Sequence, residues 1–155
     1  KLVTVTAMTL GMSIGSIIIF EILKDQFAWD LTADTSNEAA VSKFGNLKNN
    51  WVLFFTIIPV IWLESFLEEI LDRGFMMNWI EKVFSNTLFA TVLAVILQAA
   101  IFGFRHSNDF SERSITVGLI GLGMGLGYVI FGRNLWPLIL AHCLLNTASM
   151  LDRVG

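Results

Sequence analysis

The stretch "ESFLEEILDRGF", residues 64–75, decides how this chain folds, because it places a cluster of charges inside an apolar sequence. Its five ionisable residues are Glu64, Glu68, Glu69, Asp72 and Arg73. A charged side chain at the centre of a bilayer costs roughly 2.5–3.5 kcal/mol on insertion scales. The cluster therefore has to face a protein interior, pair internally or line a water-filled cavity.

The composition of the 155-residue chain indicates an integral membrane protein. Hydrophobic residues make up 55% and charged residues only 15%, against about 25% charged in an ordinary soluble domain. The ten Lys and Arg residues are scattered, so no nucleic-acid partner is expected. The single cysteine, Cys143, cannot form an internal disulfide and is expected to be a small core residue.

Five apolar segments are long enough to span a bilayer, which takes roughly 20 residues. They are 2–23, a segment that begins at Trp51 and runs past the charge cluster, 88–104, 115–131, and a last one that reaches Leu151. We therefore predict an all-α, polytopic integral membrane protein with about five transmembrane helices. Residues 1–50 are expected to form one membrane helix and an exposed loop, and residues 51–155 a helical core.

The spacing of the charges favours a position within one long helix, because apolar residues resume directly after Arg73. The alternative is an interfacial cluster at a helix end. Glu69 and Arg73 are four residues apart, in the order that favours an ion pair on a helix. Arg73 would then neutralise and orient Glu69, which leaves Glu68 as the carboxylate free to act as a general base.

Two later segments carry histidines. In "FGFRHS", residues 102–107, Phe102 and His106 share a helix face; the alternative is a histidine that merely caps a helix end. In "HCLLN", residues 142–146, His142 and Asn146 again share a face within an apolar run. Intramembrane histidines are rare and often functional, although a hydrogen bond between two helices would also explain this pair. A glycine-rich run, residues 118–127, indicates a face for close helix packing.

Three motifs thus stand in order along apolar segments. They are Glu68-Glu69-x-x-x-Arg73, Phe102-x-x-x-His106 and His142-x-x-x-Asn146. In this combination the chain resembles the CPBP family, the CAAX-protease and bacteriocin-processing intramembrane proteases, also called the Abi family. The resemblance covers about residues 60–150 and implies a CPBP-type helical core in a bacterial plasma membrane.

What the resemblance implies is an endopeptidase that cleaves a membrane-associated peptide or protein. By the same resemblance, Glu68 and His106 would hold and activate the attacking water. Glu69 and Arg73 would orient the site. The only further partners expected are membrane lipid and, in a non-enzymatic alternative, the other subunits of a membrane complex.

The resemblance also implies a role for the third motif: His142 and Asn146 would stabilise the oxyanion that forms when water attacks the peptide carbonyl. No cofactor is expected, and a metal-free mechanism is favoured. Zinc is the alternative, because Glu68, His106 and His142 would supply two imidazoles and one carboxylate.

One residue departs from the family pattern. Asp72 stands directly before Arg73, where the family usually has an aromatic or apolar residue. It could compete with Glu69 for Arg73 or act on Glu68. This departure motivates the alternative of a catalytically inactive scaffold, immunity protein or accessory subunit, and an ion or proton carrier is a third interpretation. Bringing the three motifs to one depth also requires a bent or short helix, with a break expected at Gly103.

Overall fold

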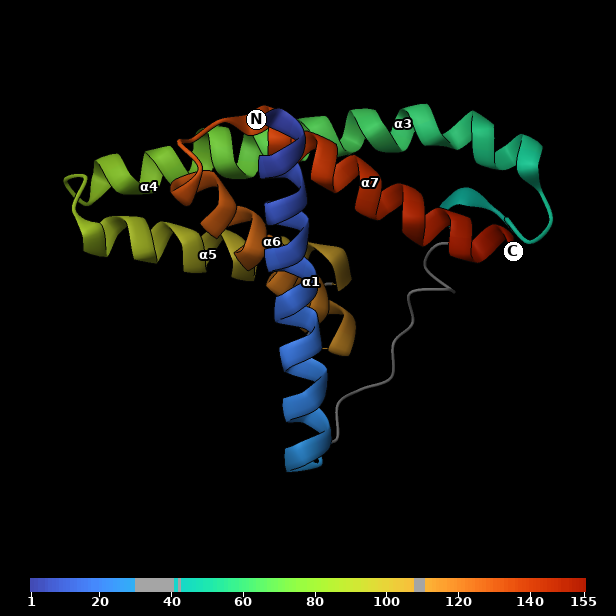
Figure 1. Cartoon of the computed structure of the whole chain (residues 1–155), viewed down its shortest axis with the longest axis horizontal. Helices are drawn as coiled ribbons and strands as arrows, with labels where there is room; N and C mark the ends of the chain where they lie inside the picture. Colours follow the sequence, from blue (N-terminus) through green and yellow to red (C-terminus); the bar gives the residue numbers. More distant parts are fainter. Residues whose placement is uncertain (30–40, 42, 108–110) are drawn as a thin grey trace.

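The computed structural model describes residues 1–29, 41, 43–107 and 111–155 of the chain, and helices without strands make up the regular structure of this part. In chain order they are α1 (Leu2–Phe27), α3 (Trp51–Glu69), η1 (Ile70–Met77), α4 (Asn78–Val83), α5 (Leu88–Ser107), α6 (Glu112–Ile130) and α7 (Leu135–Val154) (Figure 1). The predicted all-α class is confirmed. Most of the exposed loop predicted before Trp51, residues 30–40 and 42, lies outside the described residues.

Four described segments are long and apolar enough to cross a membrane, where about five were predicted. They are Leu2–Phe27, Trp51–Val83, Leu88–Ser107 and Glu112–Ile130. The fifth expected segment does form a helix, α7, of 20 residues. Its apolar character is diluted by the polar side chains it brings to the interior, among them His142 and Asn146, and by Asp152 and Arg153 near its end. The chain is a polytopic membrane protein.

The charged stretch lies inside a helix that continues without interruption from Trp51 to Val83, so the alternative of a helix end is wrong. Within it, η1 is a π-helix whose turns are wider than those of an α-helix. The side-chain amide of Asn78 donates hydrogen bonds to the carbonyls of Arg73, at 3.1 Å, and Gly74, at 2.7 Å. The amide thus fixes the backbone of the segment that presents Asp72 and Arg73 to the interior.

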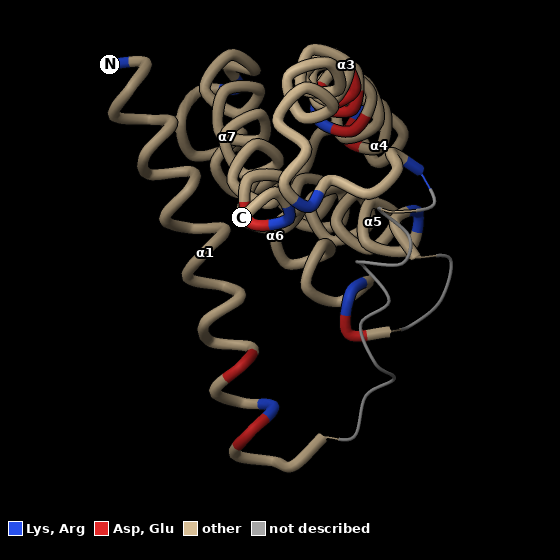
Figure 2. Tube along the Cα trace, turned by 90° about the vertical axis from the view of Figure 1, so that its right-hand side faces the viewer, with Lys and Arg blue, Asp and Glu red and all other residues tan. Residues whose placement is uncertain are grey.

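The helices do not form a simple up-and-down bundle. Helices α3, α4, α5 and α7 follow one common direction, and α1 crosses it (Figure 1). Turned by 90°, Figure 2 shows the first group nearly end-on while α1 runs along its side. Helix α6 packs against both α1 and α5 and joins the two groups. The motif-bearing helices therefore lie side by side, which brings residues from different apolar segments to one place.

Glycines on α6 permit this close crossing. A Cβ at Gly123 would lie 2.7 Å from the backbone of Ser13 on α1. A Cβ at Gly125 would lie 2.5 Å from the amide nitrogen of Gln98 on α5. Both distances are shorter than a real carbon contact. At position 123 a side chain would therefore force α1 away from α6, and at position 125 it would displace the amide of Gln98. The packing face predicted for residues 118–127 is confirmed.

Gly103 serves the same purpose on α5, and the helix break predicted there is wrong. Helix α5 is continuous through this residue. A Cβ at Gly103 would lie 2.3 Å from the carbonyl oxygen of Ser114 and 2.9 Å from the backbone of Gly118. The glycine therefore allows α6 to lie directly against the end of α5 that carries His106.

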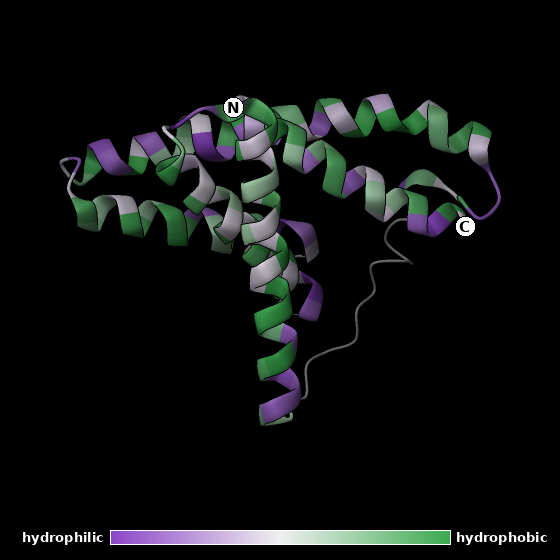
Figure 3. Ribbon diagram, viewed as in Figure 1, coloured by the Kyte–Doolittle hydropathy of each residue, from purple (hydrophilic) through white to green (hydrophobic). Residues whose placement is uncertain are grey.

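The outer surface of the bundle is largely apolar, and the charges occur at defined places (Figures 2 and 3). At the far end of α1, Lys24 bonds Glu112 at 2.7 Å and ties α1 to the start of α6. At the other side, Arg133 makes two hydrogen bonds of 2.7 Å to Glu81 and holds the turn before α7 against α4. The Glu81 carboxylate raises the pKa of Arg133 by accepting these bonds. These pairs fix the positions from which α6 and α7 begin.

Candidate active site

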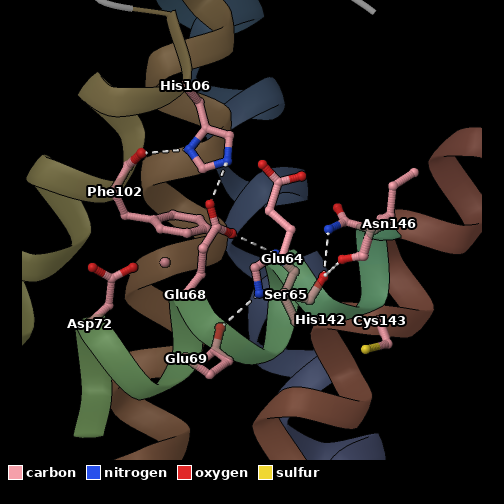
Figure 4. A network of polar contacts seen from close by, with 12 residues as sticks. Glu64, Ser65, Glu68, Glu69, Asp72, Phe102, His106, His142, Cys143 and Asn146 are labelled. Atoms are coloured by element: carbon pink, nitrogen blue, oxygen red, sulfur yellow. Dashed lines mark hydrogen bonds and ion pairs between the residues drawn. The ribbon is translucent and has the colours of Figure 1, made fainter. Parts of the chain in front are cut away.

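The three motifs meet around the side chain of Glu68 (Figure 4). Its Oε1 lies 3.9 Å from Nε2 of His106, which comes from the last turn of α5. Its Oε2 lies 3.6 Å from Nε2 of His142 on α7. Residues from three helices, far apart in the sequence, therefore converge on one carboxylate.

Hydrogen bonds at the opposite nitrogens orient both imidazole rings. Nδ1 of His106 lies 2.7 Å from the carbonyl oxygen of Phe102, and Nδ1 of His142 lies 2.8 Å from Oε1 of Glu69. A carbonyl and a carboxylate can only accept, so each Nδ1 carries a proton. In the neutral rings, the lone pairs at Nε2 then face Glu68. A carboxylate flanked by two such acceptors is suited to hold a water molecule through the water's hydrogens.

Arg73 neutralises Glu69, as the spacing predicts. Both side chains are fully buried, and Nη1 of Arg73 donates to Oε1 of Glu69 at 2.9 Å. Nη2 donates to the carbonyl oxygen of Gly121 on α6 at 3.0 Å, and the guanidinium lies 4.9 Å from the ring centroid of Phe102. Buried charges persist only when they are paired and hydrogen-bonded. Arg73 thus holds the carboxylate that holds His142.

Asn146 lies near this cluster, but its amide contacts a residue that the sequence did not single out. Its Nδ2 donates to the hydroxyl of Ser65 at 2.9 Å, and that hydroxyl donates to the carbonyl of Ile61 at 2.9 Å. Ser65 is fully buried on α3, three residues before Glu68. In the sequence, the signal for Ser65 was a polar residue within an apolar segment, one helical turn before Glu68.

Competition of Asp72 with Glu69 for Arg73, one of the two possibilities raised by the sequence, is weak in the structure. The nearest carboxylate oxygen of Asp72 is 3.8 Å from Nη1 of Arg73, against 2.9 Å for Glu69. Asp72 instead accepts two hydrogen bonds from Arg105, Nη1 to Oδ1 at 3.2 Å and Nη2 to Oδ2 at 2.9 Å. The extra acid therefore has a cation of its own.

The polar cluster opens into a cavity of about 630 Å³. Its lining includes the side chains expected to carry the chemistry, namely Glu68, His106, His142 and Asn146. A second hollow of about 510 Å³ lies next to it and is lined by apolar residues of α3 and η1, namely Val60, Leu63, Leu67 and Leu71. Glu64, Glu68 and Arg105 line both spaces. An apolar chain lying in the second hollow would thus end beside the carboxylate.

Glu64 and Cys143 lie at the edge of the cluster. Glu64 pairs with Lys43 at 2.6 Å, with both side chains about half exposed. The sulfur of Cys143 lies below the His106 side chain in the view of Figure 4, 3.9 Å from the carbonyl of Trp62. Cys143 is half-buried rather than in the core, and its role as a packing residue rather than a nucleophile stays a prediction.

A metal-binding role for the histidines stays an open expectation. Within the described ranges, no group of three or more His, Cys, Asp or Glu side chains is arranged as a metal-binding set. The metal-free reaction and the zinc alternative, with Glu68, His106 and His142 as ligands, are both left to experiment.

Comparison with known proteins identifies the family of the chain. Residues 49–148 match the family described as type II CAAX prenyl endopeptidase Rce1-like. No curated protein and no solved structure matches the chain. The match spans α3 to most of α7 and includes every residue of the three motifs.

Proposed function

Because this chain belongs to the Rce1-like family of type II CAAX prenyl endopeptidases, we propose that it hydrolyses a peptide bond of a membrane-associated peptide or protein with a water that Glu68 and His106 activate. The observation that carries the proposal is the convergence of His106 Nε2, at 3.9 Å, and His142 Nε2, at 3.6 Å, on the two oxygens of Glu68. The family to which the chain belongs is a family of membrane proteases, which supports a hydrolase as the proposed activity.

The proposed reaction begins with water held between Glu68 and His106. Glu68 takes one proton from the water while the water oxygen attacks the scissile carbonyl carbon. The carbonyl oxygen then becomes an oxyanion. When the tetrahedral intermediate collapses, the C–N bond breaks and Glu68 returns the proton to the leaving nitrogen. General acid–base catalysis of this kind contributes about 10²–10⁴-fold to a rate.

Asn146 and His142 are the proposed donors to the oxyanion. Asn146 bonds Ser65 through one N–H of its amide, which leaves the second N–H for the substrate. His142 would donate through Nε2 when it is protonated, and the carboxylate of Glu69, 2.8 Å from Nδ1, would stabilise that imidazolium. One oxyanion donor is typically worth about 2.7–4 kcal/mol.

The substrate we propose has an apolar chain close to the scissile bond. The apolar hollow along α3 lies next to the polar cavity, and Glu68 lines both. The family description names prenylated CAAX substrates for its members, and a prenyl group or an apolar peptide segment would suit this hollow. Membrane lipid is the expected surrounding, in a bacterial plasma membrane, and no cofactor is proposed.

The alternative of an inactive scaffold, immunity protein or accessory subunit rested on Asp72. That residue has its own partner, Arg105, and the ion pair of Glu69 with Arg73 is intact. Asp72 therefore leaves the ion pair of the first motif intact. The experiment below can still support the inactive alternative.

The test uses purified protein in lipid nanodiscs and two internally quenched peptides ending in a CAAX sequence, one farnesylated and one not. Glu68→Gln and His106→Ala should each lower kcat by about 10²–10⁴-fold. Glu21→Gln on α1, a carboxylate outside the site, is the matched control. Unchanged cleavage by the Glu68→Gln protein would refute the assigned role. No cleavage by the wild type, with stable co-purification of a membrane partner, would support the non-enzymatic alternative.

A further inference from the structure

Asp72 and Arg105 form an ion pair at the edge of the proposed site. Asp72 is fully buried on η1, and it accepts two hydrogen bonds from Arg105, at 3.2 and 2.9 Å. A guanidinium and a carboxylate in this two-bonded geometry form one of the strongest side-chain pairs in proteins. The pair therefore determines where the positive charge of Arg105 lies.

That charge lies close to the proposed base. Arg105 directly precedes His106 in the sequence, and its side chain lines the same two cavities as Glu68. Glu68 and Asp72 are four residues apart on one helix and so present neighbouring carboxylates. Among the described residues, Arg105 forms its ion pair with Asp72 and none with Glu68.

Without Asp72, Glu68 is the carboxylate that Arg105 would meet. The acidic side chains that line the two cavities are Glu64 and Glu68. Glu64 is already paired with Lys43 at 2.6 Å. Glu68 lies 3.9 Å from Nε2 of His106 and 3.6 Å from Nε2 of His142. A guanidinium bound to Glu68 would occupy the carboxylate oxygens that otherwise face the histidines and the cavity.

We propose that Asp72 is a positioning residue that holds Arg105 away from Glu68 and so keeps this carboxylate available to the histidines and to water. The shortest contact of each arginine is then with a different acid, Arg73 with Glu69 and Arg105 with Asp72, although Asp72 also lies 3.8 Å from Arg73. Of the described acids that line the two cavities, Glu68 is the one for which no ion pair with lysine or arginine is formed. The inference rests on the proposed function for its kinetic part.

The kinetic test compares Asp72→Asn, Arg105→Gln and the double variant with the farnesylated quenched peptide in nanodiscs. Asp72→Asn should lower kcat by about tenfold or more with KM little changed, because the guanidinium of Arg105 would occupy the oxygens that accept the proton from water. Arg105→Gln and the double variant should both stay within about threefold of wild type, because the guanidinium that Asp72 holds is then absent. The second substitution thus rescues the first.

A purely structural role for the ion pair makes a different prediction. Either single variant breaks the pair, so Arg105→Gln would then lose as much activity as Asp72→Asn, and the double variant would not recover. That result would overturn the inference. Thermal unfolding of each variant, followed by tryptophan fluorescence, separates loss of folded protein from loss of rate.

A structure of the Asp72→Asn protein tests the inference without any substrate. The guanidinium of Arg105 should lie within hydrogen-bond distance of Glu68, and a guanidinium that stays at residue 72 would refute the proposal. If the proposed function is wrong, the sign is a different one, namely that the Glu68→Gln protein cleaves the peptide as fast as wild type. The two outcomes are therefore distinguishable.

Discussion

Nδ1 of His142 lies 2.8 Å from Oε1 of Glu69, and the same oxygen accepts a hydrogen bond of 2.9 Å from Arg73. This one carboxylate oxygen therefore joins the first and third motifs. It orients the His142 ring so that Nε2 faces Glu68, and it gives the buried guanidinium of Arg73 its counter-ion. The proposed chemistry and the stability of the bundle both depend on Glu69.

Glu69→Gln should therefore destabilise the protein strongly. The substitution leaves the fully buried Arg73 with only the more distant carboxylate of Asp72, at 3.8 Å, among its described partners, and breaking a buried pair on one side costs about 3–5 kcal/mol. Glu64→Gln, the same change five residues earlier on α3, removes a half-exposed pair with Lys43 and should cost less than about 1 kcal/mol. Thermal unfolding in detergent micelles measures both. Equal effects would contradict the role given to Glu69.

Ser65→Ala should lower kcat about tenfold and leave KM nearly unchanged, because the amide of Asn146 loses the hydroxyl that orients it. Thr56→Ala is the matched control: its hydroxyl makes the same bond to the preceding turn of α3, at 2.8 Å, but lies on the exposed face. A double variant of Ser65 and Asn146 should be no slower than Asn146→Ala. Additive losses would show that Ser65 acts independently of Asn146.

The parts of the site that the sequence predicted are those set by local spacing. Glu69 and Arg73 are four residues apart on one helix, so their pairing at 2.9 Å follows from helix geometry. The bond of His106 to the carbonyl of Phe102 has the same origin. The grouping of the three motifs around one cavity came from the family resemblance rather than from the residues.

The contacts that the sequence did not predict join distant helices. Asn146 and Ser65 are 81 residues apart, and Asp72 and Arg105 are 33 apart. Their meeting depends on how closely the helices pack, and this is set by contacts such as that between Gly103 and Ser114. Hydropathy gave four of the five predicted spanning segments, but it carries no information on the direction in which one helix crosses another.

Chelation should leave the activity unchanged if the proposed metal-free reaction is correct. Glu68 and the two Nε2 atoms can hold water by hydrogen bonds alone, because both Nδ1 atoms are already bonded. Cleavage of the quenched peptide is measured after dialysis of the protein against 1,10-phenanthroline and again after adding zinc back. Loss of activity that zinc restores would replace the proposal with the alternative ligand set of Glu68, His106 and His142.

Gly103→Ala should destabilise the bundle and lower activity together. The new Cβ would lie 2.3 Å from the carbonyl oxygen of Ser114, a backbone atom that cannot rotate away, so α5 and α6 must separate at the end that carries His106. Overpacking of this kind costs about 1–3 kcal/mol.

Gly15→Ala on α1 is the control, because a Cβ there meets nothing within 4 Å. This variant should be neutral or stabilise the helix by up to about 1 kcal/mol. Thermal unfolding and peptide cleavage are measured on both variants. A stable, fully active Gly103→Ala protein would contradict the close contact on which the position of His106 depends.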